Sequence, residues 1–124
     1  VVVLGSTAGT AKDAVDELRA EGRPVGLLEL HAFRPFPHER LREALKPLRD
    51  VAVLDRADSP GGRPPLFAEV AAAMTSCPTS LSSYVYGLGG RDLHPEDIRA
   101  VLHDLPSDRR DPVYVGLRSE PCRD

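Results

Sequence analysis

A glycine-rich stretch, YVYGLGGRD at residues 84–92, has the spacing that comes closest to a cofactor-binding motif in this chain. Glycines between a strand and a helix often hold phosphate, because their backbone amides can approach the ligand closely. A dinucleotide-binding loop requires the spacing G-x-G-x-x-G, and Asp92 stands where the third glycine belongs. A carboxylate there would also repel a pyrophosphate. The stretch therefore indicates a strand-to-helix corner with a charged tip, and not a nucleotide loop.

A second corner of this kind, GSTAGTAK at residues 5–12, gathers hydroxyl side chains. It is not a P-loop, because no Gly-Lys-Ser/Thr sequence ends it. The hydroxyls of Ser6, Thr7 or Thr10 could cap the following helix by accepting hydrogen bonds from its first amides. The same helix N-terminus could instead hold a phosphate or a carboxylate. Plain capping is the preferred interpretation.

Short apolar runs alternate with helical patterns along the chain. Strands are predicted at residues 1–5, 25–30, 51–55, 83–88 and 112–117. Helices are predicted at residues 6–22, 38–50, around 66–74 and from residue 95 onward. Apolar residues recur in these helices at three- and four-residue spacing. The alternation is typical of βαβ units, so we predict an α/β fold with a mostly parallel sheet and helices on both faces.

Single residues add local predictions. The expected apolar face of the second helix comprises Leu41, Ala44, Leu45 and Leu48. Pro47 should end that helix early, because proline lacks an amide hydrogen. His94 is predicted at the N-cap of the fourth helix. Glu29 interrupts an apolar strand, and it could be a buried acid or could face water on an edge strand.

Polar residues and glycines gather where the predicted strands end. The carboxyl ends of parallel strands form one rim, at which ligands or partner domains dock. The predicted rim residues are Ser6, Thr7, Arg34, Asp55, Arg56, Gly87, Gly89, Gly90, Arg91 and Asp92. Arg34 and Arg56 are candidates for a carboxylate or phosphate clamp. Solvated or interface arginines are the preferred interpretation.

Familiar catalytic and metal-binding patterns are absent from the sequence. No G-x-S-x-G elbow is present, and the four histidines lack metal-ligand spacing. Cys77 and Cys122 form no CxxC pair, which is typical of a reduced cytosolic protein. We therefore predict neither a catalytic residue nor a metal site.

Chain length, net charge and the length of the apolar runs limit the class of protein. The 124 residues fit one domain spanning 1–124, and the net charge of −3, with scattered lysines and arginines, argues against nucleic-acid binding. The apolar runs are too short to cross a membrane, and a cytoplasmic location is expected. The chain opens with VVVLG, in mid-strand and without a methionine, which suggests a fragment of a larger protein.

Three motifs in order, FRPFP at 33–37, LDR at 54–56 and GLGGRD at 87–92, resemble one known family. It is the second domain of the pyruvate:ferredoxin (flavodoxin) oxidoreductases, carried at the C-terminal end of their alpha subunit. The resemblance extends over nearly the whole chain and includes PLFAEV, PEDIRAVL and YVGLR. It implies a fold similar to the C-terminal domain of transketolase, with three layers, α/β/α, around a mixed five-stranded sheet.

The resemblance also implies a multidomain parent enzyme. Such enzymes decarboxylate pyruvate with thiamine diphosphate and Mg²⁺, and pass electrons through iron–sulfur clusters to ferredoxin or flavodoxin. Coenzyme A takes the acetyl group, and relatives act on other 2-oxo acids. The thiamine site is made by other domains, so no cofactor is expected in this one.

Two hypotheses follow for this chain. The preferred one is a non-catalytic structural domain whose rim contacts the other domains or subunits of the oxidoreductase, with a homodimer as a further option. The alternative is a module that binds an anion, coenzyme A or a metabolite. In that module Ser6, Thr7, Arg34, Arg56 and Arg91 would form the site.

Overall fold

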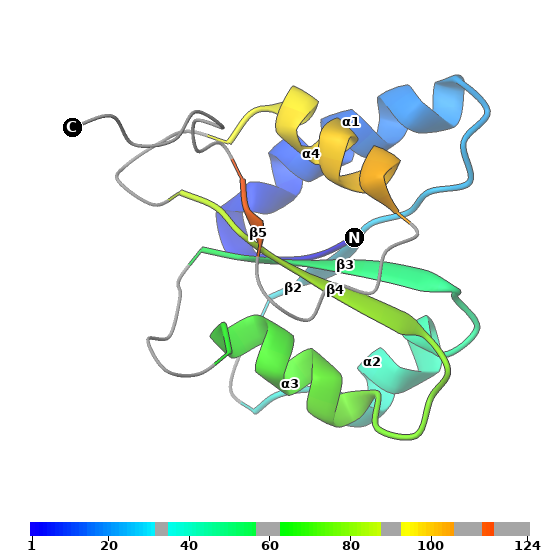
Figure 1. Ribbon diagram of the computed structural model, residues 1–124, viewed down its shortest axis with the longest axis vertical. Coiled ribbons are helices and arrows are strands. Elements are labelled where there is room, and N and C mark those ends of the chain that lie inside the picture. The colour runs from blue at the N-terminus through cyan, green and yellow to red at the C-terminus, as the bar shows by residue number, and fades with distance from the viewer. Residues whose placement is uncertain (32–34, 57–62, 88–92, 106–112, 116–124) are drawn as a thin grey trace.

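The computed structural model describes residues 1–31, 35–56, 63–87, 93–105 and 113–115 (Figure 1). The strands are β1 (Val2–Leu4), β2 (Leu28–Leu30), β3 (Asp50–Asp55), β4 (Ser80–Val85) and β5 (Val113–Tyr114). The helices are the 3₁₀ turn η1 (Gly5–Thr7), α1 (Ala8–Ala20), α2 (His38–Leu45), α3 (Pro65–Ala73) and α4 (Pro95–Asp104). The predicted five strands and four helices are therefore all present.

The strands form one sheet in the order β2-β1-β3-β4-β5. All four pairings are parallel, with Val3 opposite Glu29 and Leu54 opposite Tyr84. Helices α1 and α4 cover one face of the sheet, and α2 and α3 cover the other (Figure 1). The predicted three-layer α/β/α fold is confirmed. The resemblance implied a mixed sheet, whereas the strands that the structure describes pair only in parallel.

Two apolar cores lie on the two faces of the sheet. Successive side chains of a strand point to opposite faces, so Ala52 and Leu54 pack under α1 and α4 while Val53 packs under α2 and α3. Burial on both faces explains why β3 reads as a continuous apolar run. Phe67 of α3 and Ile98 of α4, both fully buried, anchor the helices to the two cores.

Polar contacts fix the helices to each other within each layer. Arg99 of α4 bonds to Glu21 at 2.7 Å and Glu17 at 3.2 Å, at the end of α1. The hydrogen bond from Arg99 lowers the pKa of the Glu21 carboxyl. On the other face, Arg42 of α2 donates to the Thr75 carbonyl oxygen at 2.8 Å, just beyond α3.

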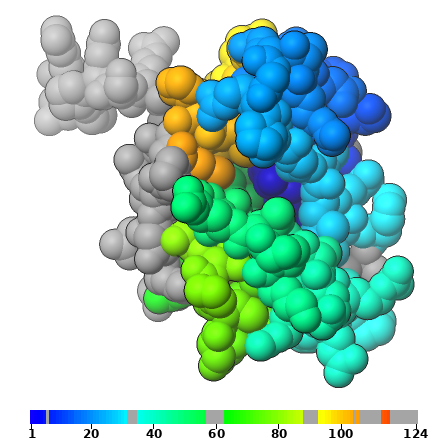
Figure 2. Space-filling model, turned by 90° about the vertical axis from the view of Figure 1, so that its right-hand side faces the viewer, coloured from blue at the N-terminus to red at the C-terminus, as the bar shows by residue number. Residues whose placement is uncertain are grey.

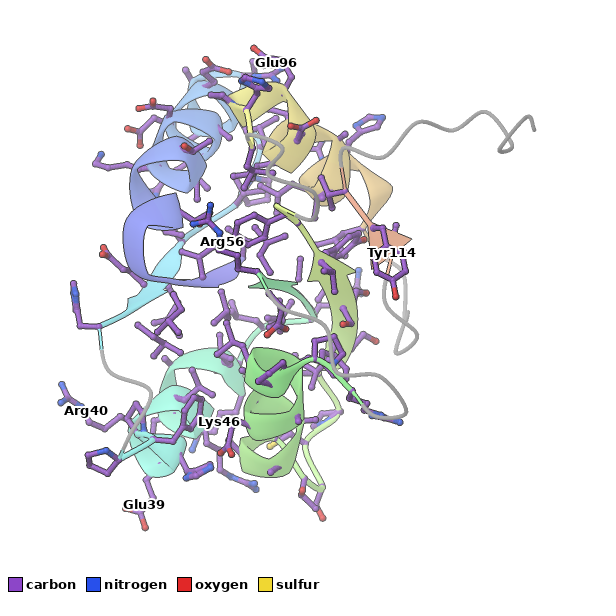
Figure 3. All side chains as sticks on the ribbon, turned by 90° about the vertical axis from the view of Figure 1, so that its left-hand side faces the viewer. Glu39, Arg40, Lys46, Arg56, Glu96 and Tyr114 are labelled. Carbon is purple, nitrogen blue, oxygen red and sulfur yellow. The ribbon has the colours of Figure 1, made fainter. Side chains whose placement is uncertain are left out.

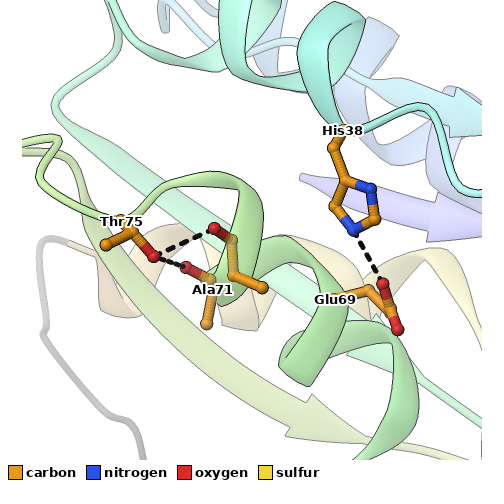
Figure 4. Close-up of polar contacts among 5 residues, drawn as sticks. His38, Glu69, Ala71 and Thr75 are labelled. Atoms are coloured by element: carbon orange, nitrogen blue, oxygen red, sulfur yellow. Dashed lines mark hydrogen bonds and ion pairs between the residues drawn. The ribbon is translucent and has the colours of Figure 1, made fainter.

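Figure 4 shows the second tie between α2 and α3, in which His38 Nε2 lies 2.8 Å from a Glu69 carboxylate oxygen. The Thr75 hydroxyl donates to the carbonyl oxygens of Ala72 at 2.9 Å and Ala71 at 3.5 Å, and so closes the last turn of α3. These contacts hold α2 and α3 together as one layer.

Strand β2 and helix α2 bear on two local predictions. Glu29 is exposed on the edge strand β2, as one of the two interpretations required. Helix α2 ends at Leu45, two residues before Pro47, so the early end is confirmed. The inclusion of Ala44 and Leu48 in its buried face was wrong, because both are exposed and Leu48 follows the end of the helix.

No helix within the described ranges is long and apolar enough to span a membrane.

The end of α2 gives a matched pair of substitutions. Leu41→Ala should lower the free energy of unfolding by about 2–5 kcal/mol, because Leu41 is 2% exposed and its removal leaves a cavity. Leu48→Ala should change it by less than about 0.5 kcal/mol, because Leu48 is 47% exposed. Urea unfolding followed by circular dichroism measures both. Similar losses in the two variants would contradict the assignment of the helix end.

Candidate docking rim at the carboxyl edge of the sheet

The strand order locates the edge at which a site can form. From β1 the chain passes outward to β2, and it then returns to the other side of β1 to build β3, β4 and β5. The crevice beyond the carboxyl ends of β1 and β3 is the topological switch point of such a sheet, where ligands of parallel α/β proteins bind. The segments after β1, β3 and β4 meet at this edge, where Figure 3 labels Arg56.

Four of the predicted rim residues can be placed. Thr7, Asp55, Arg56 and Gly87 all lie at the carboxyl edge, directly after or at the ends of β1, β3 and β4. The other predicted rim residues fall outside the described part of the chain. They are Arg34, Gly89, Gly90, Arg91 and Asp92, together with the side chain of Ser6.

Asp55 is a buried carboxylate at the end of the central strand β3. It is 4% exposed, and it accepts hydrogen bonds from the backbone amides of Leu66 at 2.6 Å and Phe67 at 3.0 Å. These amides belong to the first turn of α3, which starts at Pro65 and whose N-cap, Pro64, has no side-chain acceptor. The carboxylate therefore caps α3 from another element, and its charge lies at the positive end of the helix dipole.

Thr7 bonds across the sheet, and does not cap α1. Its hydroxyl forms a buried hydrogen bond with the Tyr86 hydroxyl, which follows β4. Thr7 occupies the N-cap position of α1 and makes no side-chain capping bond there. Of the three candidate caps Thr7 is therefore excluded, because a buried tyrosine hydroxyl needs a partner and the nearby threonine supplies it.

The guanidinium of Arg56 lies over the ring of the same tyrosine. Its guanidinium carbon is 5.9 Å from the centroid of the Tyr86 ring, within the range of a cation–π interaction. Gly87 follows with φ +76°, a backbone conformation that suits glycine. A Cβ at Gly87 would lie 3.4 Å from Arg56 Nε, so the absence of a side chain there leaves room for the arginine.

Tyr86 is the rim residue that the sequence did not reveal. It is 5% exposed and connects Thr7 and Arg56, which are 49 positions apart in the sequence. Its backbone amide also donates to the Asp55 carbonyl oxygen at 2.8 Å, which continues the β3–β4 ladder beyond the strand. The signal was available, since Tyr84 and Tyr86 share one face by period-two alternation and a buried tyrosine hydroxyl needs a polar partner.

Helix α4 begins at Pro95, as predicted. His94 occupies the N-cap of α4, and its backbone amide donates to the Asp97 carboxylate at 2.9 Å. This bond is one half of a capping box. Asp97 and Glu96 also put negative charge in the first turn, where the helix dipole favours it.

A hollow of the described surface lies at the opposite, amino edge of the sheet. It has a volume of about 450 Å³, and Figure 2 shows the deep-blue start of the chain at its floor. Its lining includes Pro24, Leu48, Arg49 and Leu105. None of the four rim residues that the structure describes borders it.

The described residues provide no recognisable set of metal ligands. No group of three or more histidines, cysteines and acids in the described ranges could hold a metal ion. The complete sequence contains two cysteines, whereas an iron–sulfur cluster is generally held by four thiolates. The iron–sulfur clusters implied for the parent enzyme therefore do not fit the thiols of this chain.

Fold and rim together define a class of protein: a parallel α/β/α domain whose carboxyl edge is ordered by an aspartate cap, a threonine–tyrosine bond and an arginine laid on the tyrosine. The family model described as pyruvate:ferredoxin oxidoreductase core domain II matches residues 1–98. The chain belongs to this family, and the resemblance seen in its motifs is confirmed.

Named relatives agree with this assignment. The chain is 48% identical to pyruvate synthase subunit PorA of Thermotoga maritima, over 95% of this chain and 31% of the relative. It is 43% identical to ketoisovalerate oxidoreductase subunit VorA of Pyrococcus furiosus, over 82% of this chain and 26% of the relative. It is 32% identical to a pyruvate-flavodoxin oxidoreductase of Enterobacter agglomerans, over 97% of this chain and 11% of the relative. The chain thus spans less than a third of the length of these proteins.

The Asp55 cap gives a prediction about stability. Asp55→Asn should lower the free energy of unfolding by about 1.5–3 kcal/mol, because a neutral amide replaces a charged acceptor of two buried amides. Asp16→Asn is the matched control, since Asp16 pairs with Lys12 on the exposed surface of α1 and should cost less than about 0.5 kcal/mol. Chemical unfolding measures both. Equal losses would contradict the capping role of Asp55.

The bond between Thr7 and Tyr86 predicts a non-additive pair. Thr7→Val and Tyr86→Phe should each cost about 1–2 kcal/mol of unfolding free energy, because each leaves the other hydroxyl buried without its partner. The double variant should cost no more than the worse single one, since both polar groups are then gone. A double-mutant cycle measures the coupling, and strict additivity would show that the two hydroxyls do not interact.

Proposed function

We propose that this chain is a non-catalytic structural domain of a 2-oxoacid:ferredoxin or flavodoxin oxidoreductase of the pyruvate type, and that its role is to assemble the multidomain enzyme. The observation that carries the proposal is the match of residues 1–98 to core domain II of that family, in a chain that spans less than a third of its named relatives. Two of those relatives are named as subunits, which supports assembly with other chains.

The arrangement of the rim supports a structural role over a chemical one. Two of its polar groups bond to groups of the same domain: Asp55 to the amides of α3, and Thr7 to Tyr86. Groups held in this way give an edge of fixed shape. Such an edge can meet another domain without reorganisation, and this lowers the entropic cost of association.

Further properties of the parent enzyme belong to the same proposal. It would use thiamine diphosphate and Mg²⁺ in its other domains, and iron–sulfur clusters held elsewhere. Ferredoxin or flavodoxin would take the electrons and coenzyme A the acetyl group, in the cytoplasm. Pyruvate is the preferred substrate because the relative with 48% identity is a pyruvate synthase subunit.

The proposal predicts that residues 1–124 and the remainder of the parent polypeptide, co-expressed as two chains, form a stable complex. Native mass spectrometry and size-exclusion chromatography detect it. Pyruvate oxidation should be present when the complex is combined with the other subunits of the enzyme, and absent from the 124-residue chain alone. Residues 1–124 alone should give no heat of binding with thiamine diphosphate and Mg²⁺ in calorimetry. Micromolar binding, or two chains that stay apart, would overturn the assembly role.

The alternative, a module for coenzyme A or another metabolite, depends on Arg34, Arg56 and Arg91 converging on one anion. Arg56 is the one of these three that the structure describes. The same calorimeter separates the two functions, because a metabolite module binds coenzyme A as an isolated chain, whereas an assembly domain does not.

A further inference from the structure

Arg56 is a basic residue of the docking rim that has no acidic partner among the described residues. Lys12, Lys46 and Arg99 are each within 3.2 Å of a carboxylate oxygen, and Arg42 donates to carbonyl oxygens. Arg56 is exposed at the end of the central strand, and no carboxylate of the described residues pairs with it. Its neighbour Asp55 directs its carboxylate to the amides of α3.

The guanidinium is nevertheless held in place. The Tyr86 ring lies on one side of it, and Tyr86 is itself fixed by its bond to the buried Thr7 hydroxyl. The Cα of Gly87 borders its stem, where a Cβ would lie 3.4 Å from Nε. An arginine ordered before binding loses less entropy when it forms a bidentate pair, and its rigid fork matches planar oxyanions.

The charge around Arg56 favours one kind of anion. Asp55 and Arg56 are the charged residues of the rim within the described ranges, and together they are close to neutral. A phosphate group carries nearly two negative charges at neutral pH and would be repelled by Asp55. A carboxylate carries one charge, and its two oxygens fit one edge of a guanidinium.

We propose that Arg56 is the anchor of the docking rim and that it binds a side-chain carboxylate, Asp or Glu, of an adjoining domain in the parent oxidoreductase. Tyr86 and Gly87 are its positioning residues. This proposal rests on the assembly role above and deepens it, because it names the chemistry that the partner must present. The ligand is a protein carboxylate, and a free phosphate-bearing ligand is the outcome that the experiment must distinguish.

The first test uses the co-expressed pair of chains described above. Arg56→Ala should weaken their association at least about ten-fold, and Arg56→Lys should recover only part of it, because an ammonium lacks the bidentate fork. Arg40→Ala is the matched control, since Arg40 is an exposed arginine of α2 that points into solvent (Figure 3). All three variants should keep the melting temperature of the unmodified chain. Equal affinity for Arg56→Ala and Arg40→Ala would overturn the proposal.

The second test measures anion binding at Arg56 without any partner chain. Sodium acetate added to the ¹⁵N-labelled chain at constant ionic strength should give a saturable shift of the Arg56 Nε–H and Gly87 amide resonances, and none at Arg40. Inorganic phosphate should bind no more tightly than acetate. A linear, equal response at Arg56 and Arg40 would overturn the site, and much tighter phosphate binding would overturn the carboxylate assignment. If the two chains fail to associate but acetate binds, the assembly role is wrong and the anion site remains.

Discussion

The rest of the structure depends on one charge–dipole contact, the Asp55 carboxylate against the first amides of α3. Any helix leaves its first amides without intrahelical acceptors, and α3 begins with two prolines that supply no capping side chain. The acceptor comes instead from the end of β3, so the contact fixes where α3 starts relative to the sheet. Phe67, which donates one of the two bonds, is also among the largest buried side chains of the core below α3.

Asp55 and its neighbour Arg56 together order both sides of the rim. Asp55 turns toward α3, and the next residue, Arg56, turns toward Tyr86 and the α1 side. Adjacent residues at a strand end point to opposite faces, so one dipeptide serves the two helical layers. The LDR motif is thus a junction between layers, and its aspartate and arginine have separate tasks that a sequence motif alone does not distinguish.

Much of this could be predicted from the sequence, for identifiable reasons. Apolar periodicity predicted the five strands and the four α-helices, and prolines marked the end of α2 near Pro47 and the start of α4 at Pro95. The rim residues followed from the rule that parallel strands end at one edge. Contacts between distant segments were beyond that reasoning, because they depend on strand order. Thr7 was one of three candidate caps of its nearest helix, whereas its bond goes to Tyr86. Leu48 fitted the helical spacing, but α2 ends three residues before it.

The edge strand β2 limits how copies of this domain can meet. It has three residues, its middle side chain is the exposed Glu29, and Pro24 and Pro35 lie within a few residues of either end. Such an edge offers few free backbone groups to an incoming strand, and its charge opposes a flat apolar approach. Sheet-to-sheet fusion along β2, a common route to insoluble protein, is thereby suppressed. An edge of this kind lowers the tendency of the domain to pair with a second sheet.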